Sequence, residues 1–271
     1  MILFSHLAFF WFVVFGVQAV KTLRGDFAIF CKEHDVSPKS KRLKNEPIGR
    51  DDFCSYSIKY FWEVLKSLST RRKDVIQKFG FGCLLFFKKS DIPSAFVRWL
   101  ASSVDPVSSQ IIVDDCKVIS ISKDSVFRDI GLPNSGNVPL PDSERGAKLI
   151  KSMFGLSELP HITFFGNKLK STEVLSDKEV LVCFIAVAFK SFLLPSLDGY
   201  PNTDFLHILE EPESACSFDL CEIVYEHTIS GVSKFIKTCK INGRKPKVFE
   251  FCYYALAVSF PSLLCSCFVA S

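Results

Sequence analysis

KFGFGCLLFFKKSDIPSAFVRWLASSVDPVSSQIIVDDCKVISISKDSVFRDIGLPNSG, from Lys78 to Gly136, decides the fold, because it places helix, hairpin and cap signals in one fixed order. Within it, Ile92 to Val104 predicts a short helix with one buried face. Pro93 falls in the first turn of that helix, where its missing N–H costs nothing. The apolar residues at helical spacing are Ile92, Phe96, Trp99, Leu100 and Val104.

A β-hairpin is predicted after this helix. The runs Ile111–Val113 and Val118–Ile121 are rich in β-branched residues, which favour strands. The four residues between them, Asp114 to Lys117, favour a turn. The pattern therefore predicts an antiparallel hairpin over residues 111–121.

A helix of about two turns is predicted to follow the hairpin. Ser122 can accept backbone N–H bonds as its N-cap. Gly131 supplies the residue with positive φ that ends the helix, and Pro133 forbids continuation. Its apolar residues are Val126, Phe127 and Ile130.

The ordered series resembles the plant mobile domain family, also labelled aminotransferase-like, which occurs in plant nuclear proteins and transposon-derived genes. GFGCLL at Gly80 to Leu85 resembles the family's opening, and FVRWLASSVDP at Phe96 to Pro106 resembles its helix that ends in an acidic turn. DSVFRDIGLPNSG at Asp124 to Gly136 is similar to its Asp-Val-x-x-x-Leu-Gly-Leu-Pro-x-x-Gly element. It departs from that element at Ser125 and Ile130.

Two later segments extend the resemblance, so that it covers roughly residues 55–260. FKSFLLPSLDGYPNTDFLHIL at Phe189 to Leu209 resembles the family's Phe-Leu-x-Pro and Tyr-Pro segment. FCYYALAVSF at Phe251 to Phe260 resembles its late Cys-x-Tyr-x-Leu helix, without the glycine pair that often precedes it. The resemblance fades where a complete domain should continue, so we expect a truncated member of the family.

The local signals and the resemblance together predict a mainly α-helical globular domain with one small β-hairpin. The resemblance implies a nuclear, non-catalytic interaction module of transposon origin. The roles that it implies are gene silencing, genome integrity and meristem maintenance, and the implied partner is a nuclear protein.

The longest helical signal runs from Ser176 to Leu194, with a capping box at Ser176 and Glu179. This segment is apolar almost all round, which predicts a helix buried in the core. Ser217 is predicted to cap a further helix, and Phe249 to Val269 to form an apolar helical run. We expect one core to contain Trp99, Phe127, Ile130, Phe184, Phe189 and Tyr253.

Composition sets broad limits on the class of protein. The chain has 271 residues, 48% of them hydrophobic, which allows one or two domains with a substantial core. Its formal net charge of +4 is too small to indicate polyanion binding by itself. The 11 Cys are odd in number and lie mostly in apolar segments, so we expect reduced thiols rather than a disulfide framework.

The N-terminal segment, residues 1–20, is uncharged and apolar, whereas residues 21–52 form a polar linker and residues 53–271 form the predicted domain. Three interpretations of the first segment stay open: a secretory signal, a membrane anchor, and a non-native start created by gene rearrangement or a faulty gene model. The resemblance favours the last and a location in the nucleus. The first two would place the chain in the secretory pathway or at a membrane.

Two short basic stretches are candidates for weak nucleic-acid binding, although such runs are usually only solvated. The second surrounds a predicted turn at Asn242-Gly243, and Arg71-Arg72-Lys73 is predicted to be a solvated helix start. The candidate residues are Lys39, Lys41, Arg42, Lys44, Lys237, Lys240, Arg244 and Lys245.

No catalytic constellation is visible in the sequence, so we predict neither an enzyme nor a cofactor. The five His lie outside His-Glu-x-x-His or similar metal spacing, and Cys31-x-x-His34 and Cys265-x-Cys267 lack second halves. Gly80-Phe81-Gly82 favours tight helix packing over phosphate binding. The alternative from another class is a cysteine-dependent hydrolase whose partner residues are brought together only by the fold.

Overall fold

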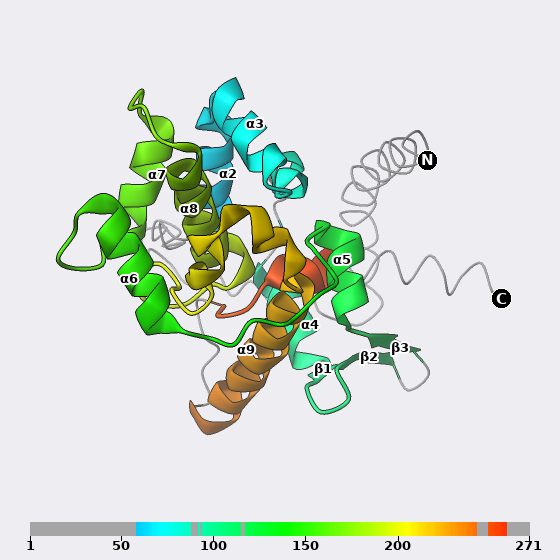
Figure 1. The fold of residues 1–271 in the computed structure, drawn as a ribbon. Helices are drawn as coiled ribbons and strands as arrows, with labels where there is room; N and C mark the ends of the chain where they lie inside the picture. Colours follow the sequence, from blue (N-terminus) through cyan, green and yellow to red (C-terminus); the bar gives the residue numbers. More distant parts are fainter. Residues whose placement is uncertain (1–57, 88–91, 93, 115–116, 243–248, 259–271) are drawn as a thin grey trace, which may run out of the picture. The chain divides into compact units, whose positions relative to one another are not determined.

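The computed structural model describes residues 58–87, 92, 94–114, 117–242 and 249–258, which all belong to the compact unit Phe53–Ser259. This part of the chain is mainly helical, as predicted, with one small antiparallel sheet (Figure 1). Residues 253–258 are also helical. The labelled elements are α2 (Ile58–Ser67), α3 (Thr70–Lys78), η1 (Gly82–Phe86), α4 (Ser94–Ser102), β1 (Val104–Asp105), β2 (Gln110–Asp114), β3 (Lys117–Ser120), α5 (Lys123–Ile130), α6 (Ser143–Phe154), α7 (Ile162–Lys170), α8 (Asp177–Ala188), η2 (Phe189–Leu193), η3 (Leu206–Glu210), η4 (Pro212–Ser217) and α9 (Leu220–Asn242).

Helix α8 supplies the centre of the core. Every residue from Val180 to Ala188 is buried, because the helix packs against α3, α7 and η3. The predicted capping box is confirmed: the Ser176 side chain accepts from the Glu179 N–H, and the Glu179 carboxylate accepts from the Ser176 N–H. The helix continues into one π-helical turn, η2, and ends at Leu194 before Pro195.

The predicted hairpin is confirmed and gains a third strand. β2 pairs with β3 in antiparallel register, with Ile111 opposite Ile119, and β1 adds to the other side of β2. Val104 was predicted to lie on the helix but pairs with Ile111. The Ser102 and Ser103 hydroxyls donate to carbonyls four residues earlier, a contact that commonly bends or destabilises a helix, and α4 ends there.

Helix α5 begins and ends as predicted. The Ser122 side chain accepts from the Ser125 N–H, and Gly131 has a φ of 80°. The expectation that Phe127 lies in the core is wrong, because its side chain is 49% exposed. Val126 and Ile130 point inward, and a residue one step from Val126 is turned by about 100° around the helix.

The main core holds half of the residues predicted to share it. Ile130, Phe184 and Phe189 are members of the central cluster. Trp99 stacks on Phe96, and Tyr253 packs on Phe249, which also contacts Phe235 of α9; neither Trp99 nor Tyr253 belongs to the central cluster. Sequence spacing identified these rings as apolar but could not show that they lie outside the central cluster.

Helix α9 begins at Leu220, and its cap is Asp219 rather than the predicted Ser217. The Glu222 N–H donates to the Asp219 Oδ1 at 3.0 Å. Ser217 instead ends η4, where its hydroxyl donates to the Ser214 carbonyl. Of the predicted run from Phe249 to Val269, residues 253–258 are helical, and residues after 258 lie outside the described part.

Candidate functional site

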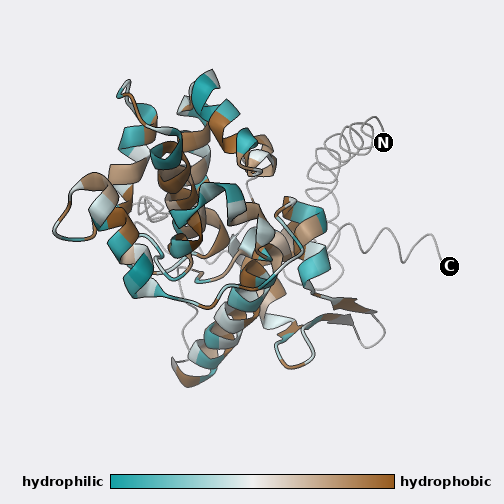
Figure 2. Cartoon of the chain, in the orientation of Figure 1, coloured by the Kyte–Doolittle hydropathy of each residue, from teal (hydrophilic) through white to brown (hydrophobic). Residues whose placement is uncertain are grey.

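The outer face of the β2–β3 hairpin is apolar and exposed. Ile112 and Val118 lie opposite each other on the two strands and are 48% and 51% exposed. Ile111 and Ile119 point to the other face and are buried. Figure 2 shows both strands in brown, and Figure 1 shows the sheet beside α4 and α5. We call Ile112 and Val118 the outer pair.

The edge of β3 that faces away from β2 has no partner strand among the described residues, and we call it the free edge. The Ile112 N–H donates to the Ser103 carbonyl, so the backbone groups of Ile112 face β1. The Ile121 N–H donates to the Ser109 carbonyl, so alternate residues of β3 face β2. The N–H and C=O groups of Val118 and Ser120 therefore face outward, and in the described part of the chain neither residue bonds across that edge.

Hydrogen bonds fix the loop between β1 and β2. The Asp105 carboxylate accepts from the backbone N–H groups of Val107 and Ser108 and from the Ser108 hydroxyl. These bonds, led by that of the hydroxyl, hold the pKa of Asp105 below its usual value. The Tyr225 hydroxyl of α9 donates to the Ser109 Oγ at 2.9 Å. The sheet is thereby tied to α9.

The C-terminal half of α9 presents a row of lysines. Lys234, Lys237 and Lys240 are all exposed, and none makes an ion pair within the described residues. The predicted candidates Lys237 and Lys240 lie on α9, which extends to Asn242, where the turn was predicted. The predicted candidates outside the described residues are Lys39, Lys41, Arg42, Lys44, Arg244 and Lys245.

The acidic residues of α9 lie at its other end. Glu222 and Glu226 fall in the first two turns, and the pKa of Glu222 is raised by partial burial and then by the charge of Glu226. The Lys123 ammonium of α5 pairs with the Asp219 carboxylate at 2.7 Å. The exposed side of α9 is therefore acidic near its start and basic near its end.

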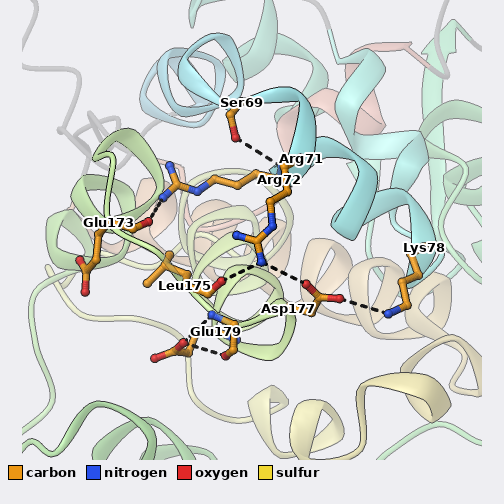
Figure 3. Close-up of polar contacts among 9 residues, drawn as sticks. Ser69, Arg71, Arg72, Lys78, Glu173, Leu175, Asp177 and Glu179 are labelled. Carbon is orange, nitrogen blue, oxygen red and sulfur yellow. Dashed lines mark hydrogen bonds and ion pairs between the residues drawn. The ribbon is translucent and has the colours of Figure 1, made fainter.

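Arg72 corrects the prediction of a solvated helix start. Its side chain comes from α3 (Figure 3) and is only 7% exposed. The guanidinium donates to three carbonyls at the end of α7 and just beyond it, at 2.9, 2.6 and 2.8 Å. The helix end would otherwise leave these carbonyls without intrahelical partners. The acceptors are Leu169, Ser171 and Glu173.

Two exposed cations extend this contact along α3. Arg71 donates to the Leu175 carbonyl at 3.2 Å and lies 3.6 Å from the Asp177 carboxylate. Lys78 donates to the other Asp177 oxygen at 3.1 Å (Figure 3). We call Arg71, Arg72 and Lys78 with these acceptors the α3 clamp. It fastens α3 to the loop between α7 and α8.

Five of the six described thiols have a raised pKa. All six described cysteines are free. Burial raises the pKa of Cys83, Cys183, Cys221 and Cys252 to about 12 and also raises that of Cys216. A catalytic cysteine requires a lowered pKa, because the thiolate is the nucleophile. Among the described residues, no group of three or more His, Cys, Asp or Glu could hold a metal ion.

Lys190 is the one fully buried lysine among the described residues, and its amine is occupied. It lies in η2 and donates to the Ser196 carbonyl at 3.1 Å, and also to the Ser196 hydroxyl and the Asp198 carboxylate. Burial acts to raise the pKa of Asp198, but the hydrogen bond and charge of Lys190 lower it on balance. This geometry holds the loop after Pro195 and uses all three N–H donors of the Lys190 amine.

Comparison with known proteins identifies a family. A family model described as a domain of unknown function (DUF8566) matches residues 54–257, almost the same range as the compact unit Phe53–Ser259. The chain belongs to this family. No curated protein and no solved structure matches the chain.

Within the DUF8566 domain, the segment GLPNSG, residues 131–136, positions the start of α9. The Pro133 carbonyl accepts from the first N–H groups of α9, those of Leu220 and Cys221. Asn137 bridges Phe218, and Gly136 leaves no room for a Cβ beside the Ser217 carbonyl. The segment therefore seats the start of α9, which is a structural role.

The sequence left open whether the chain has a membrane anchor in residues 1–20. No helix in the described part of the chain has both the length and the apolar character needed to cross a membrane, and residues 1–20 lie outside that part.

Gly80, with a φ of 82°, packs so closely on Cys216 of η4 that a Cβ would collide with the sulfur. Tight packing at Gly80-Phe81-Gly82 is confirmed.

Proposed function

We propose that the chain is a non-catalytic interaction module that acts in the nucleus through a protein partner. The resemblance of residues 78–136, 189–209 and 251–260 to the plant mobile domain supports a transposon origin. It also supports a role in gene silencing, genome integrity or meristem maintenance. The raised thiol pKa values favour this function over a cysteine-dependent hydrolase.

The observation that carries the proposal is the free edge of β3 beside the outer pair. Val118 and Ser120 offer outward N–H and C=O groups at strand spacing, and apolar side chains of Ile112 and Val118 lie exposed next to them. A segment of another protein that adds as a strand would satisfy these groups. Its alternate side chains would cover the outer pair. The expected partner is thus a nuclear protein with an extended segment of alternating apolar residues.

The experiment is a pull-down from nuclear extract with the full chain and two variants. Val118→Pro removes an N–H that points outward and leaves the β2–β3 ladder intact, since proline is accepted on edge strands in that orientation. Leu140→Thr is the control, because Leu140 is 83% exposed and lies outside the sheet. We expect one set of proteins bound by the full chain and by Leu140→Thr, and lost with Val118→Pro. Equal capture by all three chains would refute the assignment.

A further inference from the structure

The row of lysines on α9 forms a surface separate from the hairpin. Lys234, Lys237 and Lys240 follow one another at intervals of three residues, so they span about 9 Å of helix axis and stay within one side of the helix. The buried residues Gly231, Val232 and Phe235 occupy the opposite side. In Figure 1 this end of α9 extends beyond the other labelled helices.

The charge of this row is not neutralised by its own helix. The carboxylates nearest in sequence along α9 are those of Glu226 and Glu222. Glu226 precedes Lys234 by eight residues, which is about 12 Å along the axis and more than the Debye length of about 8 Å at physiological salt. Neighbouring lysines of the row are only about 4.5 Å apart along the axis, within that length, so each adds to the positive field of the next.

Lysines in the last turn of α9 complement the negative end of the helix dipole, but this effect falls off within that turn. Lys234 lies two turns before Asn242, where the dipole effect no longer accounts for a lysine. Duplex nucleic acid carries one phosphate per about 1.7 Å of axis, so roughly five phosphates lie within the 9 Å that the row spans.

We infer that the C-terminal half of α9 binds the phosphate backbone of duplex nucleic acid, independently of base sequence. Each lysine replaces a condensed counterion at one phosphate. The contribution of three such contacts to the binding constant falls roughly 40-fold between 50 and 200 mM salt, from a slope of about 0.9 per contact. This surface shares no residue with the outer pair, so binding here does not depend on the proposed protein partner.

The test measures binding of the full chain to a mixed-sequence 20-bp duplex at several salt concentrations. The variant Lys234→Gln/Lys237→Gln/Lys240→Gln removes the row. The matched control Lys59→Gln/Lys73→Gln/Lys148→Gln removes the same charge from exposed positions on α2, α3 and α6. Glutamine keeps helix propensity, and circular dichroism verifies that both variants fold.

We expect the α9 variant to bind more weakly and its slope of log K against log salt to become shallower by about 2.7, with the control close to the unmodified chain. An equal loss in both variants would show that only net charge matters and would overturn the assignment. Absence of duplex binding by the unmodified chain would overturn it as well. So would salt-dependent binding of polyglutamate that exceeds binding of the duplex. The pull-down with Val118→Pro is a separate measurement, so failure of duplex binding and failure of the proposed protein interaction can be distinguished.

Discussion

Replacing Arg72 by methionine tests the α3 clamp most directly. A hydrogen bond that involves a charged group contributes about 1.5–3 kcal/mol. The bond to the Leu169 carbonyl is buried, so water cannot replace the Arg72 donor when that bond is lost. The bonds to Ser171 and Glu173 are part-buried, and water can replace them. Methionine keeps most of the apolar stem. The expected loss of unfolding free energy is therefore about 3 kcal/mol.

Urea denaturation of the full chain, followed by circular dichroism, measures this loss. With an m-value of about 2 kcal/mol/M, the midpoint should fall by about 1.5 M. Arg71→Met is the matched control, because Arg71 is 59% exposed and makes one surface ion pair with Asp177 and one part-buried hydrogen bond to the Leu175 carbonyl, which water can replace. Exposed ion pairs contribute about 0.2–1 kcal/mol, so the control midpoint should move little. Equal midpoints for the two variants would refute the claim that Arg72 closes the end of α7.

Two further predictions concern packing and pH. Gly146→Ala would gain about 1 kcal/mol in an open helix, but here the new Cβ would overlap the Thr203 carbonyl, so we expect a net loss of about 1–3 kcal/mol in urea denaturation. Lys148→Ala in the same helix should change stability by less than about 0.5 kcal/mol, and a stabilised Gly146→Ala would contradict the packing. Burial lowers the pKa of His227 below its usual value of 6.5, although its bond to the Pro195 carbonyl opposes this shift. Below about pH 6.5 the unfolded chain therefore binds more protons than the folded chain. The contribution of His227 to the unfolding free energy should therefore be constant above about pH 7 and fall as pH drops through 6.5 towards the folded pKa. His227→Gln should remove that fall, and an unchanged pH profile would show that His227 does not cause it.

Most features set by neighbours in sequence could be predicted, with the cap of α9 at Asp219 rather than Ser217 as an exception, and features set by distant contacts could not. Ser122, Gly131 and the Ser176–Glu179 capping box act within a few residues, and the structure confirms all of them. Arg72 bonds to carbonyls 97 to 101 residues away, and no local pattern distinguishes it from its neighbour Arg71.

The candidate site was predictable only in part, for a related reason. Exposure of Lys237 and Lys240 followed from their charge, and the structure agrees. The two faces of the hairpin could not be assigned, because Ile111 and Ile112, like Val118 and Ile119, are all apolar. Alternation of polar and apolar residues is the signal that identifies the outer face of a strand, and here it is missing.

The shortness of β3 has a consequence for self-association. A long, flat, apolar edge invites copies of the same protein to aggregate by pairing strands. β3 has four residues, Lys117–Ser120, and its described outward groups come from Val118 and Ser120. Two such edges could exchange only a few backbone hydrogen bonds, each contributing about 1 kcal/mol, against an association cost of at least about 4 kcal/mol. Stable pairing with a strand this short therefore requires a partner that also covers the outer pair, and amyloid-like stacking of β3 is disfavoured.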